Sequence, residues 1–252
     1  MRKRGQISIF ILLGFTLVVA FFFVLYINSG EDEKKVFDQG PSSLKGYVES
    51  CIKQVGENAI YDVSLQGGYY IPPEMSTRFV SLYLPYYWLN GASLLPALED
   101  IENQLALYLM DNINVCLNDF LPYKELGYEI VYKEGFESDA AITPNNVIFS
   151  MEYPIELKKG SSSSSFSSFN AKVDVNIRQA YSYAAAVVEE QKKHPNEIPE
   201  SFINSLAYRN GFTMEMVDYN KDEEVISLLI PQKNKDELIY AFVHKYNWSE
   251  LR

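Results

Sequence analysis

Two cysteines are the residues of this sequence whose chemistry is most tightly constrained. Cys51 and Cys116 each lie in an apolar segment with helix-like spacing. Outside the cytoplasm an even pair of cysteines favours a disulfide, and two buried free thiols are the alternative. A metal site is disfavoured because neither a CxxC motif nor a histidine cluster accompanies them. A bridge would join two helices and close a loop of about 65 residues, which contributes about 4 kcal/mol on a chain-entropy estimate.

Histidines and carboxylates offer no recognisable catalytic arrangement. The chain has only two histidines, His194 and His244, and neither lies beside a cysteine, a second histidine or a GxSxG motif. The acidic residues at 99–102 resemble helix-start charges, and Asp222, Glu223 and Glu224 resemble a turn between strands. The sequence therefore predicts no catalytic residue, metal or cofactor. A hydrolase that uses a pair of Asp or Glu side chains is kept as an alternative.

Aromatic residues are the most unusual part of the composition, with 19 tyrosines and 15 phenylalanines. Several of them gather around two loops rich in proline and glycine, and these give the candidate contact residues Tyr69, Tyr70, Tyr86, Tyr87 and Trp88. If exposed, such rings could stack on sugars or anchor a protein partner. The alternative is that they fill the core beneath the loops.

A possible modification site lies near the end of the sequence. Asn247, Trp248 and Ser249 form an N-glycosylation sequon. Its use requires exposure and a glycosylating host, and tryptophan in the middle position is unfavourable. Asn247 is therefore a candidate glycosylation site.

The amino-terminal segment predicts where these residues work. Residues 1–6 form a basic tip, and residues 7–27 form an apolar run without charge. A helix of this length reaches about 31 Å, the thickness of a bilayer core. Basic residues stay on the cytoplasmic side, so the remainder is expected outside the membrane, as a stalk at 28–43 and a domain at 44–252. A subdivision of that domain is possible near 122–127.

The overall charge argues against nucleic acid as a partner. The formal net charge is −11, from 22 basic and 33 acidic residues. The three basic residues of the tip lie on the other side of the predicted membrane, which leaves the outer part with about −14. Such a surface repels phosphate backbones.

Two resemblances concern the amino-terminal segment and the order of landmarks along the chain. The run Arg2 to Ser8 resembles the class III signal peptide of archaeal type IV pilin-like proteins, which implies cleavage between Gly5 and Gln6. That family usually carries glutamate four residues after the glutamine, where this chain has Phe10. The order of landmarks is similar to that of membrane-anchored archaeal envelope proteins. These landmarks are the RKRGQISIF start, Cys51, the turn 66–69, the segment 85–87 and Cys116.

The hydrophobic pattern predicts an α+β fold with a mainly helical first half that contains two long helices. An antiparallel sheet with further helices is expected in the second half. The segment 79–89 is expected to be a short strand or irregular loop, and 158–168 a mobile serine-rich loop. Helices are expected at 44–65, 96–120, 180–193 and 199–208, and strands at 128–132, 146–157, 169–177, 212–219, 224–230 and 238–246.

Together these patterns predict a single-pass cell-surface protein that spans the membrane and has a structural or binding role in the envelope. Its expected partner is an envelope protein or glycan. A pilin-like subunit processed after Gly5 and an envelope hydrolase are the alternatives.

Overall fold

The computed structural model describes residues 40–233 and 235–248, with side chains from residue 43 onward. The chain divides into two units, Met1–Gly46 and Tyr47–Arg252. The predicted tip 1–6 and membrane span 7–27 lie outside the described residues, as does the stalk up to residue 39. Within the described part, no helix combines the length and apolar character needed to cross a bilayer.

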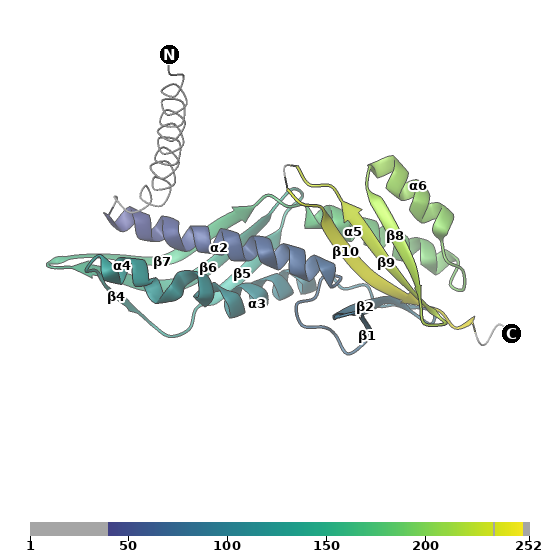
Figure 1. Ribbon diagram of the computed structural model, residues 1–252, viewed down its shortest axis with the longest axis horizontal. Coiled ribbons are helices and arrows are strands. Elements are labelled where there is room, and N and C mark those ends of the chain that lie inside the picture. The colour runs from purple at the N-terminus through teal and green to yellow at the C-terminus, as the bar shows by residue number, and fades with distance from the viewer. Residues whose placement is uncertain (1–39, 234, 249–252) are drawn as a thin grey trace, which may run out of the picture. The chain divides into compact units, whose positions relative to one another are not determined.

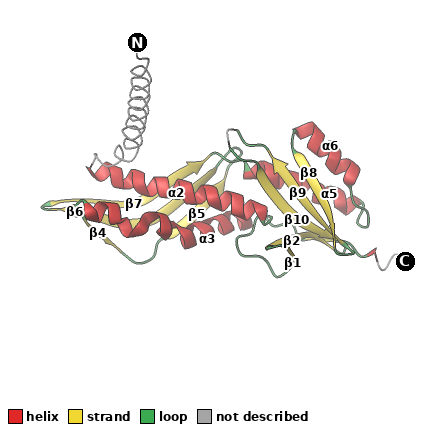
Figure 2. Cartoon of the chain, viewed as in Figure 1, coloured by secondary structure: helices red, strands yellow, loops and turns green. Residues whose placement is uncertain are grey.

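The second unit has an α+β architecture, as the sequence predicts (Figure 1). It contains two sheets, and helices pack against one side of each sheet (Figure 2). The helices are α2 (Gly40–Leu65), α3 (Leu98–Leu117), α4 (Leu121–Glu125), α5 (Ile177–Lys193) and α6 (Glu200–Asn210). The strands are β1 (Ser76–Phe79), β2 (Leu82–Leu89), β3 (Ala92–Ser93), β4 (Glu129–Tyr132), β5 (Glu137–Ile142), β6 (Val147–Lys159), β7 (Ser162–Val173), β8 (Thr213–Tyr219), β9 (Glu223–Ile230) and β10 (Leu238–Lys245).

The two long helices of the first half, α2 and α3, form where the apolar spacing predicts them. Most residues of their apolar stripes are buried, and Cys51 is 3% exposed within the stripe of α2. Asp100 caps α3 by accepting a 2.9 Å hydrogen bond from the amide N–H of Ala97. At its other end, α3 gives way to a short 3-10 turn, Asn118–Phe120. Residues 122–127, where a subdivision is possible from the sequence, form most of α4 and the turn that follows.

A glycine pair ends α2, as predicted from the sequence. Gly67 and Gly68 have φ angles of +56° and +87°, which non-glycine residues rarely adopt. A Cβ atom at Gly67 would lie 2.7 Å from the carbonyl oxygen of Ala241, and one at Gly68 would lie 2.8 Å from Cγ1 of Ile101. This turn thus requires glycine for its backbone conformation and for close packing.

The prediction of a mainly helical first half is correct only in part. In the sequence, strands β1, β2 and β3 come between the two long helices. They join the sheet of the second half, which has the strand order β1-β2-β10-β9-β8, with β3 paired to β2. Strand β2 runs parallel to β10, and this pairing begins at Tyr86. Pro85 therefore precedes the ladder with β10, so its missing N–H costs no bond there. Helices α5 and α6 pack against this sheet.

The other sheet places β6 between β7 on one side and β4 and β5 on the other, with all pairings antiparallel. Strand β5 was not expected from the sequence. Alternate residues of β6 from Val147 to Leu157 are buried, and a Cβ atom added to Gly56 of α2 would lie 2.7 Å from the Phe149 ring. Ser138 of β5 donates a 2.8 Å hydrogen bond to the Ala106 carbonyl of α3. Helices α2 and α3 therefore cover one face of this sheet.

The expectation that residues 158–168 form a loop is wrong for most of the segment, which belongs to strands β6 and β7. Serines 162–165 and 167–168 belong to β7, which forms a hairpin with β6, and residues 160–161 make the turn between the two strands. Most of these serines are exposed, so the segment lacks the alternation of polar and apolar residues that identifies a strand. The strand forms because its backbone pairs with β6, and the side-chain pattern does not predict this pairing.

Candidate functional site

The five candidate contact aromatics separate into buried and accessible residues. Tyr87 and Trp88 are 0% and 2% exposed, so these two rings are unavailable to a partner in this conformation. Tyr69, Tyr70 and Tyr86 are half-buried. Tyr87 and Trp88 therefore fill the core beneath the loops, as the alternative interpretation predicts.

Tyr87 is buried because β2 places it between the glycine turn and β10. Its hydroxyl donates a 2.8 Å hydrogen bond to the Gly67 carbonyl and lies 2.7 Å from the Tyr240 hydroxyl. Its ring stacks on Phe242 with centroids 4.6 Å apart. Burial and the Tyr240 hydroxyl hold the pKa of Tyr87 well above its ordinary value. Trp88 donates its Nε1–H to the Pro195 carbonyl at 3.3 Å.

The accessible tyrosines include two that share one hollow of about 430 Å³. Tyr69 reaches it from the loop after α2, and Tyr86 from β2. The rest of the lining comes from the loops before β1 and α3, namely Pro73, Glu74, Met75, Leu94, Leu95, Pro96 and Asp100. We call this set the aromatic hollow. Tyr70 lies apart from it, because its ring packs edge-on against Tyr108 at 5.0 Å.

A hydrogen-bonded carboxylate fixes the orientation of Tyr86. The Tyr86 hydroxyl donates a 2.7 Å hydrogen bond to Glu223, which also accepts from Thr77, Asn220 and Lys245. Burial alone would raise the pKa of Glu223, but the hydrogen bonds from Tyr86, Lys245 and Asn220 bring it below its usual value. Burial and Glu223 in turn raise the pKa of Tyr86. Tyr86 is therefore a neutral, oriented ring on a firmly held strand.

The carboxylates give the aromatic hollow an acidic character. Glu74 and Asp100 are both exposed members of its lining. Burial and the negative charge of Asp100 raise the pKa of Tyr69. The hollow thus offers tyrosine faces, apolar side chains and oxygen acceptors, a combination that suits sugar rings with their hydroxyl groups or a cationic side chain.

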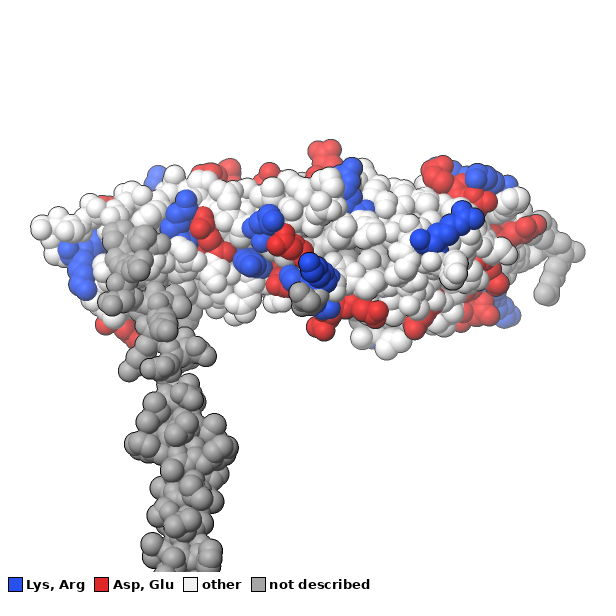
Figure 3. Space-filling model, turned by 90° about the horizontal axis from the view of Figure 1, so that it is seen from above, with Lys and Arg blue, Asp and Glu red and all other residues white. Residues whose placement is uncertain are grey.

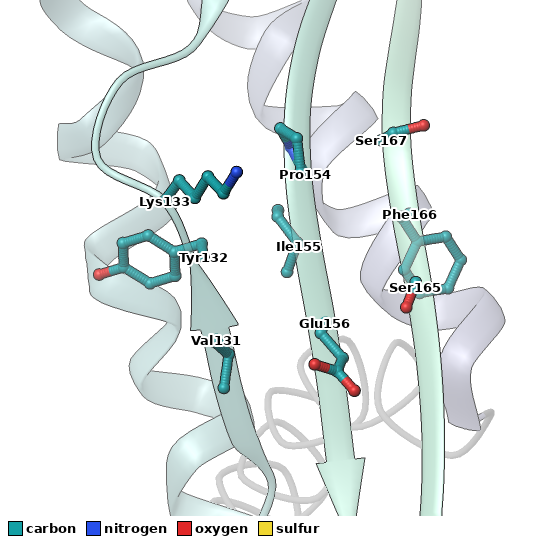
Figure 4. A pocket seen from close by; sticks show the side chains of 9 residues that line it. All are labelled: Val131, Tyr132, Lys133, Pro154, Ile155, Glu156, Ser165, Phe166 and Ser167. Atoms are coloured by element: carbon teal, nitrogen blue, oxygen red, sulfur yellow. The ribbon is translucent and has the colours of Figure 1, made fainter.

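A second hollow, of about 330 Å³, lies on the sheet of β4, β6 and β7 (Figure 4). Its lining is mainly apolar and includes Val131, Pro154 and Phe166, with Lys133 and Glu156 as its charged members. It lies at the register shift of β6 between Glu152 and Ile155, where the ladder with β7 is irregular. None of the five candidate aromatics belongs to it.

The buried polar residues of the β2–β10 sheet form a separate cluster that the sequence did not reveal. His244 and Glu224 lie directly opposite each other on β10 and β9, and Asp218 follows on β8. His244 is 0% and Glu224 4% exposed. Gln191 of α5 donates to the carbonyls of His194 and Glu197, so its Oε1 must accept.

That arrangement determines the histidine tautomer. Gln191 Oε1 accepts a 2.9 Å hydrogen bond from the Tyr246 hydroxyl and lies 3.2 Å from His244 Nδ1, so Nδ1 carries the proton. His244 Nε2 and Glu224 Oε2 are buried without a hydrogen-bond partner in the described part of the chain. Burial lowers the pKa of His244 to about 3. Burial and the neighbouring Asp218 raise the pKa of Glu224 to about 7.

The cluster of Glu224 and His244 bears on the hydrolase alternative. A carboxyl group with a pKa near 7 can give or accept a proton at neutral pH. Glu224 is, however, only 4% exposed and lines neither of the two hollows described above. Of the helix-start acids, Asp100 caps α3, and Glu102 accepts a 2.6 Å hydrogen bond from the Ile142 amide. These acids have structural roles.

The two cysteines meet as predicted. The Sγ atoms of Cys51 and Cys116 lie 2.09 Å apart, the distance of a disulfide bond, and connect α2 to α3. The Tyr47 hydroxyl donates to the Cys116 carbonyl at 3.0 Å beside the bridge.

The remaining candidate sites lie at the two ends of the chain. Asn247 is half-buried and follows β10. The neighbouring Trp248 stacks on Tyr246 at 4.8 Å and donates to the Asn196 carbonyl at 3.1 Å. Gly5 and Gln6 lie outside the described residues, so their processing stays a prediction.

Comparisons with known proteins add no family to this description. No family model, no curated protein and no solved structure matches the chain.

Proposed function

We propose that this protein is a single-pass, membrane-anchored cell-surface protein whose outer domain binds an envelope glycan through the aromatic hollow. The observation that carries the binding role is the meeting of Tyr69 and Tyr86 on the walls of one hollow that also holds two carboxylates. A volume of about 430 Å³ is within the range of small-ligand sites, about 300–1,000 Å³.

The expected setting rests on two further features. The sequence has an apolar run at 7–27 behind a basic tip, which favours an anchor with the domain outside. The disulfide-distance pair Cys51 and Cys116 supports an oxidising compartment, since such bridges are rare in the cytosol. Both features are consistent with the resemblance to archaeal envelope proteins.

The recognition chemistry follows from the lining. A sugar ring presents apolar C–H faces that stack on tyrosine, while its hydroxyl groups donate to carboxylate oxygens. Glu74 and Asp100 can accept such hydrogen bonds, and Tyr86 is already oriented by Glu223. A ligand therefore meets at least one ring that does not have to be ordered on binding, which reduces the entropic cost.

The proposal is tested with the full chain in detergent and soluble oligosaccharides prepared from archaeal envelope glycans, with binding measured by calorimetry. We expect Tyr69→Ala and Glu74→Gln each to weaken binding by about tenfold, since loss of one stacking or hydrogen-bonding contact costs about 1–2 kcal/mol. Tyr208→Ala is the matched control, because Tyr208 is 91% exposed on α6 and does not line the hollow. Equal binding by all three variants would refute a glycan site in the hollow, and binding of cationic peptides instead of glycans would reassign its ligand.

A further inference from the structure

A third hollow, of about 430 Å³, lies where α3 ends and the chain passes from β4 to β5. Four aromatic rings line it, from the 3-10 turn after α3, from β4, from the β4–β5 connection and from β6, namely Phe120, Tyr132, Phe136 and Tyr153. The other lining residues are Asn114, Leu117, Asp119, Glu134 and Gly135. We call this set the four-ring hollow. It shares no residue with the aromatic hollow.

The pairing of β6 explains how Tyr153 comes to lie at this hollow. The ladder of β6 with β5 ends at Glu152 and its ladder with β4 begins at Ile155, and the register with β7 shifts over the same step. Such irregularities redirect side chains and are frequent beside functional sites. Tyr153 is 4% exposed, and the rings of Tyr132 and Phe136 lie beside it with centroids 5.7 and 5.3 Å away. These rings are inclined to Tyr153 by 59° and 52°, so they surround a space and do not stack.

The 3-10 turn supplies two more members of the lining in a strained backbone conformation. Asn118, Asp119 and Phe120 have φ angles of 44°, 50° and 55°, in the left-handed region that non-glycine residues rarely adopt. Such strain persists only where the surrounding structure holds it, and it is concentrated at functional sites. Phe120 is 1% exposed, and its ring centroid lies 5.5 Å from Tyr132 and 6.3 Å from Tyr153.

Two polar groups of the four-ring hollow have no hydrogen-bond partner in the described part of the chain. They are the Tyr153 hydroxyl and the Glu134 carboxylate. Asp119 differs, because hydrogen bonds from Lys124 and Tyr132 satisfy it and hold its pKa below the usual value. Burial, and to a smaller extent Tyr132 and Asp119, raise the pKa of Tyr153 to about 12, so its hydroxyl stays neutral. A ligand therefore finds one unpaired hydroxyl and one unpaired carboxylate.

The charges around this hollow favour a cation. No described residue of its lining is basic. Lys133 lies between Tyr132 and Glu134 in the sequence, but Figure 4 shows its side chain extending toward Pro154, away from the Tyr132 ring. The net charge of −11 attracts cations in general, and Figure 3 shows acidic and basic side chains interspersed over one face of the molecule. Selectivity for a cation therefore has to come from a local lining such as this one.

We propose that the four-ring hollow binds the primary ammonium group of an aliphatic amine, either a lysine side chain or a free polyamine. An ammonium group has three N–H donors and no acceptor, which matches the unpaired oxygens of Glu134 and Tyr153. Tyr132 and Phe136 are half-buried, so their rings can contact the cation and the methylene groups next to it. A bare metal ion would make no use of these rings, because it binds oxygen, nitrogen or sulfur ligands. The inference goes beyond the proposed glycan binding and does not depend on it.

Matched ligands test the role of the ammonium group. Binding of N-acetyl-lysine amide to the full chain in detergent is measured by calorimetry, beside N-acetyl-norleucine amide, which has the same carbon chain without the charge. We expect the lysine compound to bind at least about tenfold more tightly. Spermidine is measured in the same way, and tighter binding of spermidine than of the lysine compound would identify a free polyamine as the ligand. Equal binding of the lysine and norleucine compounds, or no binding of either amine, would overturn the proposal.

Two conservative variants test the position of the site. Glu134→Gln and Tyr153→Phe should each weaken binding of the lysine compound by about five- to tenfold. Neither should lower the midpoint of guanidinium denaturation, because neither group has a partner within the described residues. Glu129→Gln is the matched control, since Glu129 is exposed on β4 and does not line the hollow. Unchanged binding by both variants, or an equal loss with Glu129→Gln, would overturn the proposal.

A variant of the aromatic hollow separates this inference from the proposed function. Tyr69→Ala should leave binding of the lysine compound unchanged, and Glu134→Gln should leave glycan binding unchanged, because the two hollows share no residue. Loss of amine binding in Tyr69→Ala but not in Glu134→Gln would place the amine in the aromatic hollow and overturn the inference. Failure of glycan binding alone would leave the amine site standing.

Discussion

The buried pair Glu224 and His244 predicts an unusual dependence of stability on pH. In the folded chain the pKa of Glu224 is raised from 4.5 to about 7, mainly by burial and then by Asp218. The pKa of His244 is lowered from 6.5 to about 3 by burial. The two residues face each other on adjacent strands and are both nearly inaccessible, so their shifts bear on the free energy of unfolding.

The two shifts act in opposite directions. As the pH rises from 4.5 to about 7, Glu224 loses its proton in the unfolded chain while the folded chain keeps it, so stability falls. As the pH falls from 6.5 to about 3, His244 gains a proton only in the unfolded chain, so stability falls in that direction. Each effect has a slope of about 1.4 kcal/mol per pH unit. Between pH 4.5 and 6.5 the two slopes cancel.

Replacing Glu224 by glutamine removes one of the two slopes. Glu224→Gln keeps the shape of the side chain but removes its titration. Of the two residues, only His244 then makes the free energy of unfolding depend on pH between 4.5 and 6.5. Relative to the unchanged chain, we expect the variant to lose about 3 kcal/mol at most between pH 6.5 and 4.5. Besides His244, the groups around Glu224 that carry charge or titrate include Asp218 of β8, Glu200 of α6 and Tyr246, and the substitution leaves all of them in place.

The measurement is denaturation by guanidinium chloride at half-unit pH steps from 4.5 to 6.5. Tryptophan fluorescence is a suitable signal, because Trp88 is buried on β2 next to β10 and Trp248 stacks on Tyr246. Comparing the variant with the unchanged chain cancels the contribution of all other ionisable groups. A difference in unfolding free energy that stays constant over this range would refute the reasoning. The double variant with His244→Asn should restore a flat difference.

Four further predictions follow from the same structure. Replacing Cys51 and Cys116 together by alanine should lower the free energy of unfolding by about 4 kcal/mol, measured by denaturation, and an unchanged stability under reductant would contradict a bridge. Gly68→Ala should lower the free energy of unfolding by about 1–3 kcal/mol more than Gly91→Ala. Both positions need positive φ, but only Gly68→Ala adds a Cβ atom 2.8 Å from Ile101. Equal losses in denaturation experiments would argue against close packing at Gly68. Tyr87→Phe should cost about 1–3 kcal/mol by leaving the Gly67 carbonyl and the Tyr240 hydroxyl short of a partner, whereas Tyr208→Phe should change stability by less than about 0.5 kcal/mol. The intact mass of the native protein should include residues 1–5 if the apolar helix is an anchor, and a mass that begins at Gln6 would support the pilin-like alternative.

The sequence predicted the positions of the long helices and the glycine turn that ends α2. Helices α2, α3, α5 and α6 lie within a few residues of their expected positions, because an apolar stripe of helical period is a local signal. The glycine turn after α2 was also predictable, since only glycine readily adopts the required φ. The pairing of Cys51 with Cys116 was predicted from the presence of only two cysteines in two helical segments, with two buried free thiols as the alternative, and the structure confirms the contact.

The candidate site was predicted only in part. Tyr69 and Tyr86 share a hollow, but Tyr70 packs elsewhere and Tyr87 and Trp88 are buried. Which residues of β2 are covered depends on β10 and α5, which lie far along the chain, and the ladder with β10 shifts register between Tyr86 and Trp88. No local pattern distinguishes Tyr86 from Tyr87.

By itself, the sequence determined the helical segments, the cysteine pair and the acidic charge, because composition and short-range periodicity carry them, and it predicts the anchor. Only the tertiary structure decided that β2 pairs in parallel with β10, that a run of serines forms β7, and that Glu224 faces His244. Each of these depends on the pairing of two strands through backbone hydrogen bonds, which form without regard to side-chain type. For that reason the buried acid–histidine pair could be recognised only after folding had placed the two residues beside each other.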